Sequence, residues 1–229
     1  MTEIAVPERI AQEVDLVVTA SNPFSTRYTK PGALRYRFHD QQAVEELLGC
    51  LVKGKANLIV GPHGTGKTTL LQSLLEVLND TFPSVCILKL DGVYQGWRSR
   101  IRVAVDRLRR IFSALQSLPR ESLLILDGVE QLGFISRQII LQSASVRRVT
   151  VLATSHRPML GMQVVHQTTI NSKLIRELLD QLLKGSSEEM NAKVEAWIAN
   201  DDLDQILNLR EFWFELYDLV QPDLIRGRL

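Results

Sequence analysis

The chain has 229 residues, of which 45% are hydrophobic and 23% are charged, and its net charge is +1. This length suits one α/β domain with a small appendage rather than two full domains. The near-neutral charge excludes a global electrostatic pull toward nucleic acid or an anionic membrane. No apolar stretch reaches membrane-spanning length, and Glu3 and Glu8 stand where a secretory signal would be basic, so we expect a cytoplasmic protein.

The first 39 residues have the pattern of a separate N-terminal segment. Residues 21–32 contain Pro23, Pro31 and Gly32, which favour an extended or turning chain over a helix. A helix is predicted next, over residues 40–54, because apolar residues recur on one of its faces at helical spacing.

A nine-residue run after a short strand pattern at 57–60 matches G-x-x-x-x-G-K-[ST] without a gap. The run consists of Gly61, Pro62, His63, Gly64, Thr65, Gly66, Lys67, Thr68 and Thr69. At a strand-to-helix junction, backbone N–H groups and the positive end of the helix dipole surround a phosphate. Lys67 is expected to reach the outer phosphates, and Thr68 to offer its hydroxyl to Mg²⁺. We interpret the run as a phosphate-binding loop; the alternative is a glycine-rich turn without function.

Helical and strand patterns alternate from the loop to residue 170. Helices are predicted to follow the loop as far as about residue 79, and over 98–118 and 135–144, and strands over 85–90, 123–126, 149–154 and 162–168. The run 123–126 is continuously apolar, as expected of a strand buried on both faces of a parallel sheet. Residues 40–170 are therefore predicted to form a three-layer α/β P-loop NTPase core with about five parallel strands.

Only helical patterns remain beyond residue 170. They cover residues 172–183, 187–199 and 203–220, and Gly185 and Asn200 mark the breaks. We expect residues 171–229 to form a small helical lid.

Two acidic residues follow the apolar run 123–126. Asp127 stands at the end of that strand, where a carboxylate can hold the Mg²⁺ of a nucleotide. The sequence between Lys67 and Asp127 has room for a helix, a strand and another helix, so we expect a further strand to lie between the two site strands. Glu130 is expected to orient or deprotonate an attacking water; the alternative is that it caps the next helix.

Two motifs resemble those of one ATPase group. Residues 124–130, Leu-Ile-Leu-Asp-Gly-Val-Glu, resemble the Walker B motif of the NACHT branch of the STAND ATPases. Residues 154–158, Thr-Ser-His-Arg-Pro, resemble the Thr-Ser-Arg-Pro sensor of those proteins with His156 inserted. The resemblance implies that a hydroxyl of this run senses the γ-phosphate and that Arg157 contacts it. The alternative is an Arg157 paired with a surface carboxylate.

A third motif lies in the last predicted helix. Residues 208–211, Asn-Leu-Arg-Glu, resemble the sensor 2 motif of AAA+ ATPases, in which Arg210 would fold back from the lid onto the nucleotide. Together the matches resemble the AAA+/STAND group over residues 41–217. In bacterial ATPases of this group an entry segment similar to residues 22–24, Asn-Pro-Phe, can pack on the adenine, so we expect residues 1–39 near the nucleotide.

The resemblance implies a switch or motor that binds ATP with Mg²⁺, hydrolyses it, and couples the ATP or ADP state to a protein partner. That partner is unknown, and a second copy of the chain is one form it could take. Two other functions stay open: a small-molecule kinase or other phosphotransferase, and a nucleotide-gated binding module with little turnover.

Six arginines of the helix predicted at 98–118 form a local basic feature. They are Arg98, Arg100, Arg102, Arg107, Arg109 and Arg110. A nucleic-acid contact is one interpretation, but a solvated helix face is favoured. We expect no membrane contact, and no metal other than nucleotide-bound Mg²⁺.

Overall fold

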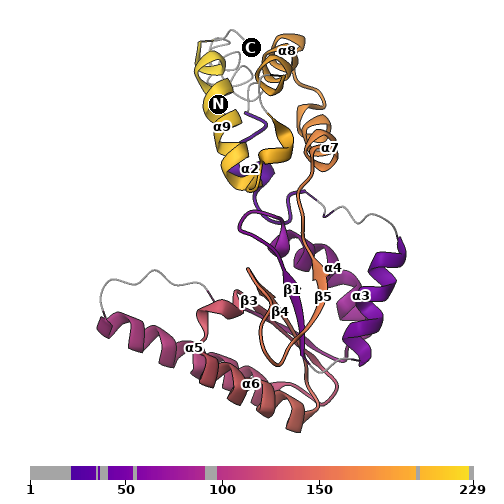
Figure 1. The fold of residues 1–229 in the computed structure, drawn as a ribbon, viewed down its shortest axis with the longest axis vertical. Coiled ribbons are helices and arrows are strands. Elements are labelled where there is room, and N and C mark those ends of the chain that lie inside the picture. The colour runs from indigo at the N-terminus through magenta and orange to yellow at the C-terminus, as the bar shows by residue number, and fades with distance from the viewer. Residues whose placement is uncertain are drawn as a thin grey trace, which may run out of the picture. The chain divides into compact units, whose positions relative to one another are not determined.

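The computed structural model describes residues 22–34, 36, 41–53, 56–90, 97–199 and 202–226. The chain divides into two compact units, a sheet unit of residues 35–169 and a helical unit of residues 1–34 and 170–229 (Figure 1). Residues 1–21, 35 and 37–39 of the predicted N-terminal segment lie outside the described residues. Among the described residues, no helix is both long enough and apolar enough to cross a membrane.

Five parallel strands form the sheet, in the order β2-β3-β4-β1-β5. The strands are β1 (Ala56–Val60), β2 (Val85–Lys89), β3 (Leu123–Asp127), β4 (Thr150–Ser155) and β5 (Gln163–Gln167). β4 pairs with both β1 and β3, so the further strand predicted between the two site strands is confirmed. Since Val60 pairs with Ser155 in register, the end of β4 lies beside the start of the phosphate-binding loop.

Helices cover both faces of the sheet (Figure 1). The helices are α3 (Gln41–Lys53) and α4 (Lys67–Thr81) on one face, and α5 (Trp97–Ser117) and α6 (Phe134–Arg147) on the other. Successive strand residues point to opposite faces. Leu124 therefore packs in the core that includes α5 and α6, and Ile125 in the core that includes α3 and α4. The predicted three-layer α/β fold is confirmed.

The helical unit contains residues from before and after the sheet, and its last helix differs from the prediction. Its elements are α2 (Thr26–Thr29), α7 (Ser172–Leu183), α8 (Glu188–Ile198), the one-turn 3-10 helix η2 (Leu203–Gln205) and α9 (Leu209–Ile225). The single helix predicted over 203–220 is wrong at both ends. α9 begins only after Asn208, whose side chain accepts a 3.1 Å hydrogen bond from the backbone N–H of Arg210. It also continues through Pro222.

Residues 22–34 pack within the helical unit. Phe24 is 1% exposed, and its ring stacks on that of Trp213 with centroids 6.2 Å apart. The Nδ2 of Asn22 donates to the carbonyl of Tyr217 and to Oε1 of Gln221. These contacts bind the segment before the sheet to the last helix of the chain.

Candidate nucleotide-binding site

The phosphate-binding loop leads from β1 into α4. Gly64 and Gly66 have φ angles of 73° and 89°, in the left-handed region that favours glycine. Gly66 is the N-cap of α4, which begins at Lys67. The free N–H groups of the first turn and the positive end of the helix dipole therefore lie at the loop, as an anion-binding site requires.

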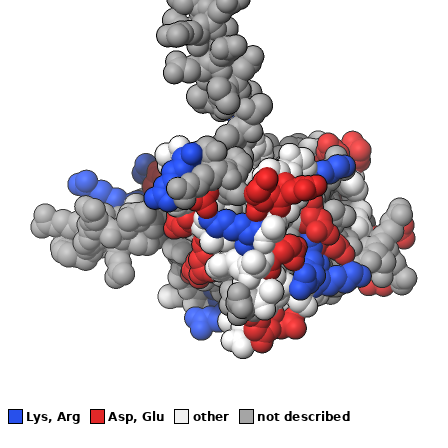
Figure 2. Space-filling view, turned by 90° about the horizontal axis from the view of Figure 1, so that it is seen from above, with Lys and Arg blue, Asp and Glu red and all other residues white. Residues whose placement is uncertain are grey.

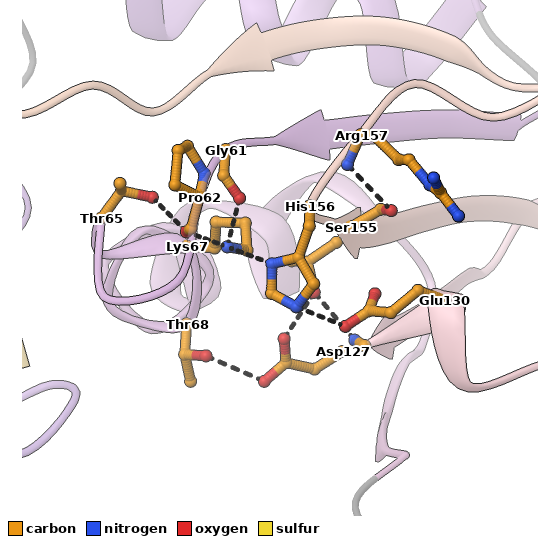
Figure 3. A network of polar contacts seen from close by, with 12 residues as sticks. Gly61, Pro62, Thr65, Lys67, Thr68, Asp127, Glu130, Ser155, His156 and Arg157 are labelled. Atoms are coloured by element: carbon orange, nitrogen blue, oxygen red, sulfur yellow. Dashed lines mark hydrogen bonds and ion pairs between the residues drawn. The ribbon is translucent and has the colours of Figure 1, made fainter. Parts of the chain in front are cut away.

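Lys67 is held by acceptors of its own loop. Its Nζ donates to the carbonyls of Gly61 and Pro62, at 2.6 and 2.5 Å, and contacts Nδ1 of His156 at 3.3 Å (Figure 3). Burial lowers the pKa of Lys67, and the nearby negative charges of Glu130 and Asp127 act in the opposite direction. The charged oxygens of a phosphate are stronger acceptors for an ammonium than neutral carbonyls.

Asp127 is joined to residues of two other elements. Thr68, in the first turn of α4, donates to its Oδ2 at 3.0 Å, and Thr154, in β4, donates to its Oδ1 at 2.6 Å. The backbone N–H of Gly128 donates in turn to the hydroxyl of Thr154 at 2.8 Å. The structure thus brings together the hydroxyl and carboxylate that the sequence predicts as metal ligands. Both are hard oxygen donors, the kind that Mg²⁺ prefers.

Glu130 lies in the short 3-10 helix η1 (Val129–Gln131) after β3. Its Oε1 is 2.9 Å from Nε2 of His156, and its Oε2 is buried with no hydrogen-bond partner among the described residues. The N-cap of α6 is Gly133. The carboxylate of Glu130 therefore contacts the site rather than capping that helix.

The two predicted sensor arginines are both exposed. The backbone N–H of Arg157 donates to Oγ of Ser155 at 3.3 Å, and its guanidinium points away from Lys67 (Figure 3). Arg210 belongs to the helical unit and lies within the last helix, as predicted, in the first turn of α9. No described carboxylate forms an ion pair with Arg157, so its alternative role is not seen either.

Sequence reasoning missed an aromatic pair of histidines. The sequence motifs place His63 in the loop and His156 as an insertion after β4, yet their ring centroids are only 3.6 Å apart. The strand order could have indicated this contact, because the two histidines follow β1 and β4, which pair in the sheet. A second pair joins Tyr36 and His166, whose Oη and Nε2 are 2.9 Å apart.

The arginines of α5 do not form a single exposed face. Arg102, Arg109 and Arg110 are exposed, whereas Arg107 is 3% exposed and its Nη1 donates to the carbonyl of Gln131 at 3.3 Å. The side chains of Arg98 and Arg100 lie outside the described part of the chain. On the molecular face seen in Figure 2, basic and acidic side chains are interspersed.

A phosphate-binding loop at the head of α4, with β4 between the loop strand and the Asp127 strand, defines a P-loop NTPase. The family model of the ATPase family associated with various cellular activities (AAA) matches residues 57–184, more than half of the chain. The chain belongs to this family.

Three solved structures have a similar fold. A DNA replication initiation factor is 19% identical with a TM-score of 0.53, and the match covers 82% of this chain and 61% of that one. The replication initiator DnaA bound to AMPPCP and single-stranded DNA is 17% identical with a TM-score of 0.54, covering 85% and 65%. AMPPCP-bound DnaA from Aquifex aeolicus is 18% identical with a TM-score of 0.54, covering 82% and 61%.

At these identities the likeness concerns the fold alone. The chain spans between 61% and 65% of the length of those structures. No curated protein sequence matches the chain.

Proposed function

We propose that this chain is a Mg²⁺-dependent ATPase that works as a nucleotide switch. It binds ATP in the loop of Lys67, hydrolyses it, and converts the change from ATP to ADP into a movement of residues 171–229 that a partner reads. The observation that supports the proposal best is the contact between Thr68 and Asp127, beside Lys67 and Glu130.

Thr68 and Asp127 would hold Mg²⁺, since Mg²⁺ in nucleotide sites takes one or two protein oxygens and completes its shell with phosphates and water. The ion supplies neutralisation of the phosphate charge when it is bound. Among the described residues no group of three His, Cys, Asp or Glu side chains is placed to hold a metal ion. The ion would enter together with the nucleotide, whose phosphates complete its coordination shell.

Lys67 exchanges its two loop carbonyls for the outer phosphates of ATP. The oxygen of a water molecule attacks the γ-phosphorus, and the bond from that phosphorus to the β,γ-bridging oxygen breaks. Glu130 orients this water and accepts its proton, which is the work of a general base. Its Oε2 is a buried acceptor with no hydrogen-bond partner among the described residues, so a water that enters the site with the nucleotide would satisfy it.

Arg157 and Arg210 would respond to the terminal phosphate. Arg157 follows β4 closely, so a rotation of its exposed side chain could bring it to the nucleotide. Arg210 lies in the first turn of α9, where the helix dipole disfavours a cation, and a bound phosphate would relieve that cost. Residues 1–39 would pack near the nucleotide, residues 40–170 would bind it, and residues 171–229 would form the moving lid.

The partner is a protein, with a second copy of this chain as one form. A DnaA structure with a similar fold holds single-stranded DNA. Arg102 and Arg109 are exposed, but the buried Arg107 interrupts the arginine cluster. Nucleic acid is therefore the less favoured partner.

The test is phosphate release from the pure full chain. We expect release with Mg-ATP, none after chelation of Mg²⁺ by EDTA, and a strong loss in Asp127→Asn. ATP binding without release would instead indicate a binding module. Formation of ADP without free phosphate, only with an added small-molecule acceptor that becomes phosphorylated, would indicate a kinase. Addition of single-stranded DNA or RNA shows whether nucleic acid changes the rate.

A further inference from the structure

His156 lies between two functional residues of the site (Figure 3). Its Nδ1 is 3.3 Å from Nζ of Lys67, and its Nε2 is 2.9 Å from Oε1 of Glu130. Because an ammonium group can only donate, Nδ1 must accept from Lys67. A neutral ring with its proton on Nε2 satisfies both contacts, since Nε2–H then donates to the carboxylate.

The ring of His156 contacts three other side chains. Besides Lys67 and Glu130 it contacts the ring of His63, at a centroid distance of 3.6 Å and an interplanar angle of 37°. The side chains of His156 and Glu130 are only 29% and 22% exposed. Their contact is thus partly shielded from water, where a charge-assisted hydrogen bond is stronger than at an open surface.

The orientation of the Glu130 carboxylate depends on this contact. Oε1 binds His156, and Oε2 has no hydrogen-bond partner among the described residues. Without His156 the carboxylate would lose the hydrogen bond that sets its direction.

We infer that His156 is a positioning residue that fixes Oε1 of Glu130 and so sets the direction of Oε2, a buried acceptor that a water entering the site would occupy. The inference rests on the proposed ATPase function. When Lys67 exchanges His156 for phosphate, only the Nδ1 contact is released, and the bond from Nε2–H to Glu130 persists. His156 thereby keeps the general base oriented in the nucleotide-bound site.

Three substitutions separate the two contacts of His156. His156→Ala removes both. His156→Gln can place its amide N–H near the position of Nε2 and so keep a donor to Glu130. His156→Asn carries the same amide group as His156→Gln but is one methylene shorter. Its amide therefore ends near the position of Nδ1 and does not reach Glu130.

The experiment measures steady-state phosphate release from the full chain with Mg-ATP. We expect kcat to fall about 10- to 100-fold in His156→Ala, as when a catalytic group is misplaced. The KM for ATP should stay within about threefold, because ground-state binding is retained. His156→Asn should match the alanine variant, and His156→Gln should restore most of the lost kcat. In a Glu130→Gln background, His156→Ala should lower kcat no further, because His156 acts through Glu130.

An unchanged kcat in His156→Ala and His156→Asn would overturn the inference. A further loss of kcat on adding His156→Ala to Glu130→Gln would also overturn it. So would a raised KM with unchanged kcat in His156→Ala, because the ring would then act on nucleotide binding through Lys67. Circular dichroism verifies the fold of each variant, and His156→Asn carries the test where His156→Ala does not fold. A parent protein that binds Mg-ATP but releases no phosphate contradicts the proposed function before any variant is made, and the inference then falls with it.

Discussion

Gly61 lies against Thr168 so closely that a Cβ at Gly61 would stand 2.0 Å from Oγ1 of Thr168 and 2.8 Å from its carbonyl oxygen. The hydroxyl of Thr168 also bonds to that of Thr65, at 2.6 Å, within the phosphate-binding loop. Thr168, the residue after β5, therefore packs against the first glycine of the loop. This close approach explains why position 61 needs a glycine.

Gly61→Ala should destabilise the sheet unit by about 1–3 kcal/mol, the usual cost of an added methyl group in a packed site. The carbonyl of Thr168 is backbone and cannot move aside cheaply. Chemical denaturation followed by circular dichroism measures the change. Gly49→Ala is the matched control, because its Cβ would meet nothing within 4 Å, and inside α3 it should be neutral or stabilise by up to about 1 kcal/mol. Equal stability of both variants would contradict the packing argument.

Lys67→Ala should abolish nucleotide binding and leave the fold intact, because among the described residues Nζ contacts only loop carbonyls and His156. Calorimetric titration with Mg-ATP measures the affinity, which we expect to fall by about 100-fold or more on loss of charge-assisted bonds to phosphate. Lys173→Ala, an exposed lysine of α7, should bind as the parent does. Unchanged affinity in Lys67→Ala would remove the basis of the nucleotide site.

Glu130→Gln should keep ATP bound and suppress turnover by about 100-fold or more, the usual effect of losing a general base. The amide retains the shape of the carboxylate but cannot accept a proton from water. Phosphate release and fluorescent-nucleotide binding are measured on the same sample. Glu76→Gln, exposed on α4, is the control and should leave both unchanged. Parental turnover in Glu130→Gln would place the base elsewhere.

Much of the sheet unit was predictable because its signals are local. The apolar run before Asp127 and the glycine pattern before Lys67 each need only neighbouring residues to be read. The contact between His156 and Glu130 was not predictable in this way, because it exists only where β3 and β4 pair. The stacking of Phe24 on Trp213 joins the two ends of the described chain, and no periodicity reports such a contact.

The start of α9 was predicted wrongly for a different reason. Residues 203–208 continue the apolar spacing of a helix, but Asn208 competes by capping the backbone at Arg210, and Asp202 caps a separate turn at Asp204. Side chains of Asn and Asp favour such caps over helix interiors. Capping by Asn208 therefore sets the start of α9 at Leu209, whereas the hydrophobic pattern alone placed it at residue 203.

The phenol of Tyr36 should ionise late in a pH titration, because burial raises its pKa to about 12 from 10.0. The raised pKa means that the folded state holds the proton more tightly than the unfolded state does. Its contribution to stability is thus complete below pH 10 and is lost as the pH rises toward 12. Absorbance of tyrosinate measures the ionisation, and Tyr36→Phe should delete the latest phase of the parent curve. A parent curve with every tyrosine ionising near pH 10 would contradict the burial of Tyr36.

Arg210→Ala tests whether the helical unit responds to the terminal phosphate. Arg210 is exposed in the first turn of α9, where a cation opposes the helix dipole by about 0.3–1 kcal/mol, so its removal should not destabilise the unit by itself. If its guanidinium contacts the γ-phosphate of ATP and loses that contact in ADP, the variant should lose most of the preference for ATP. A charge-assisted hydrogen bond of about 1.5–3 kcal/mol corresponds to roughly a 10- to 100-fold change in the affinity ratio.

The measurement compares affinities for ATP and ADP by calorimetry, together with limited proteolysis of residues 171–229 in both states. In the parent, ATP should protect these residues more than ADP does, and in Arg210→Ala that difference should disappear while the sheet unit stays folded. Arg176→Ala, exposed on α7 in the same unit, is the control and should behave as the parent. An unchanged affinity ratio with equal protection in Arg210→Ala would make Arg210 an ordinary surface arginine, because only a contact that differs between ATP and ADP can shift the position of the lid.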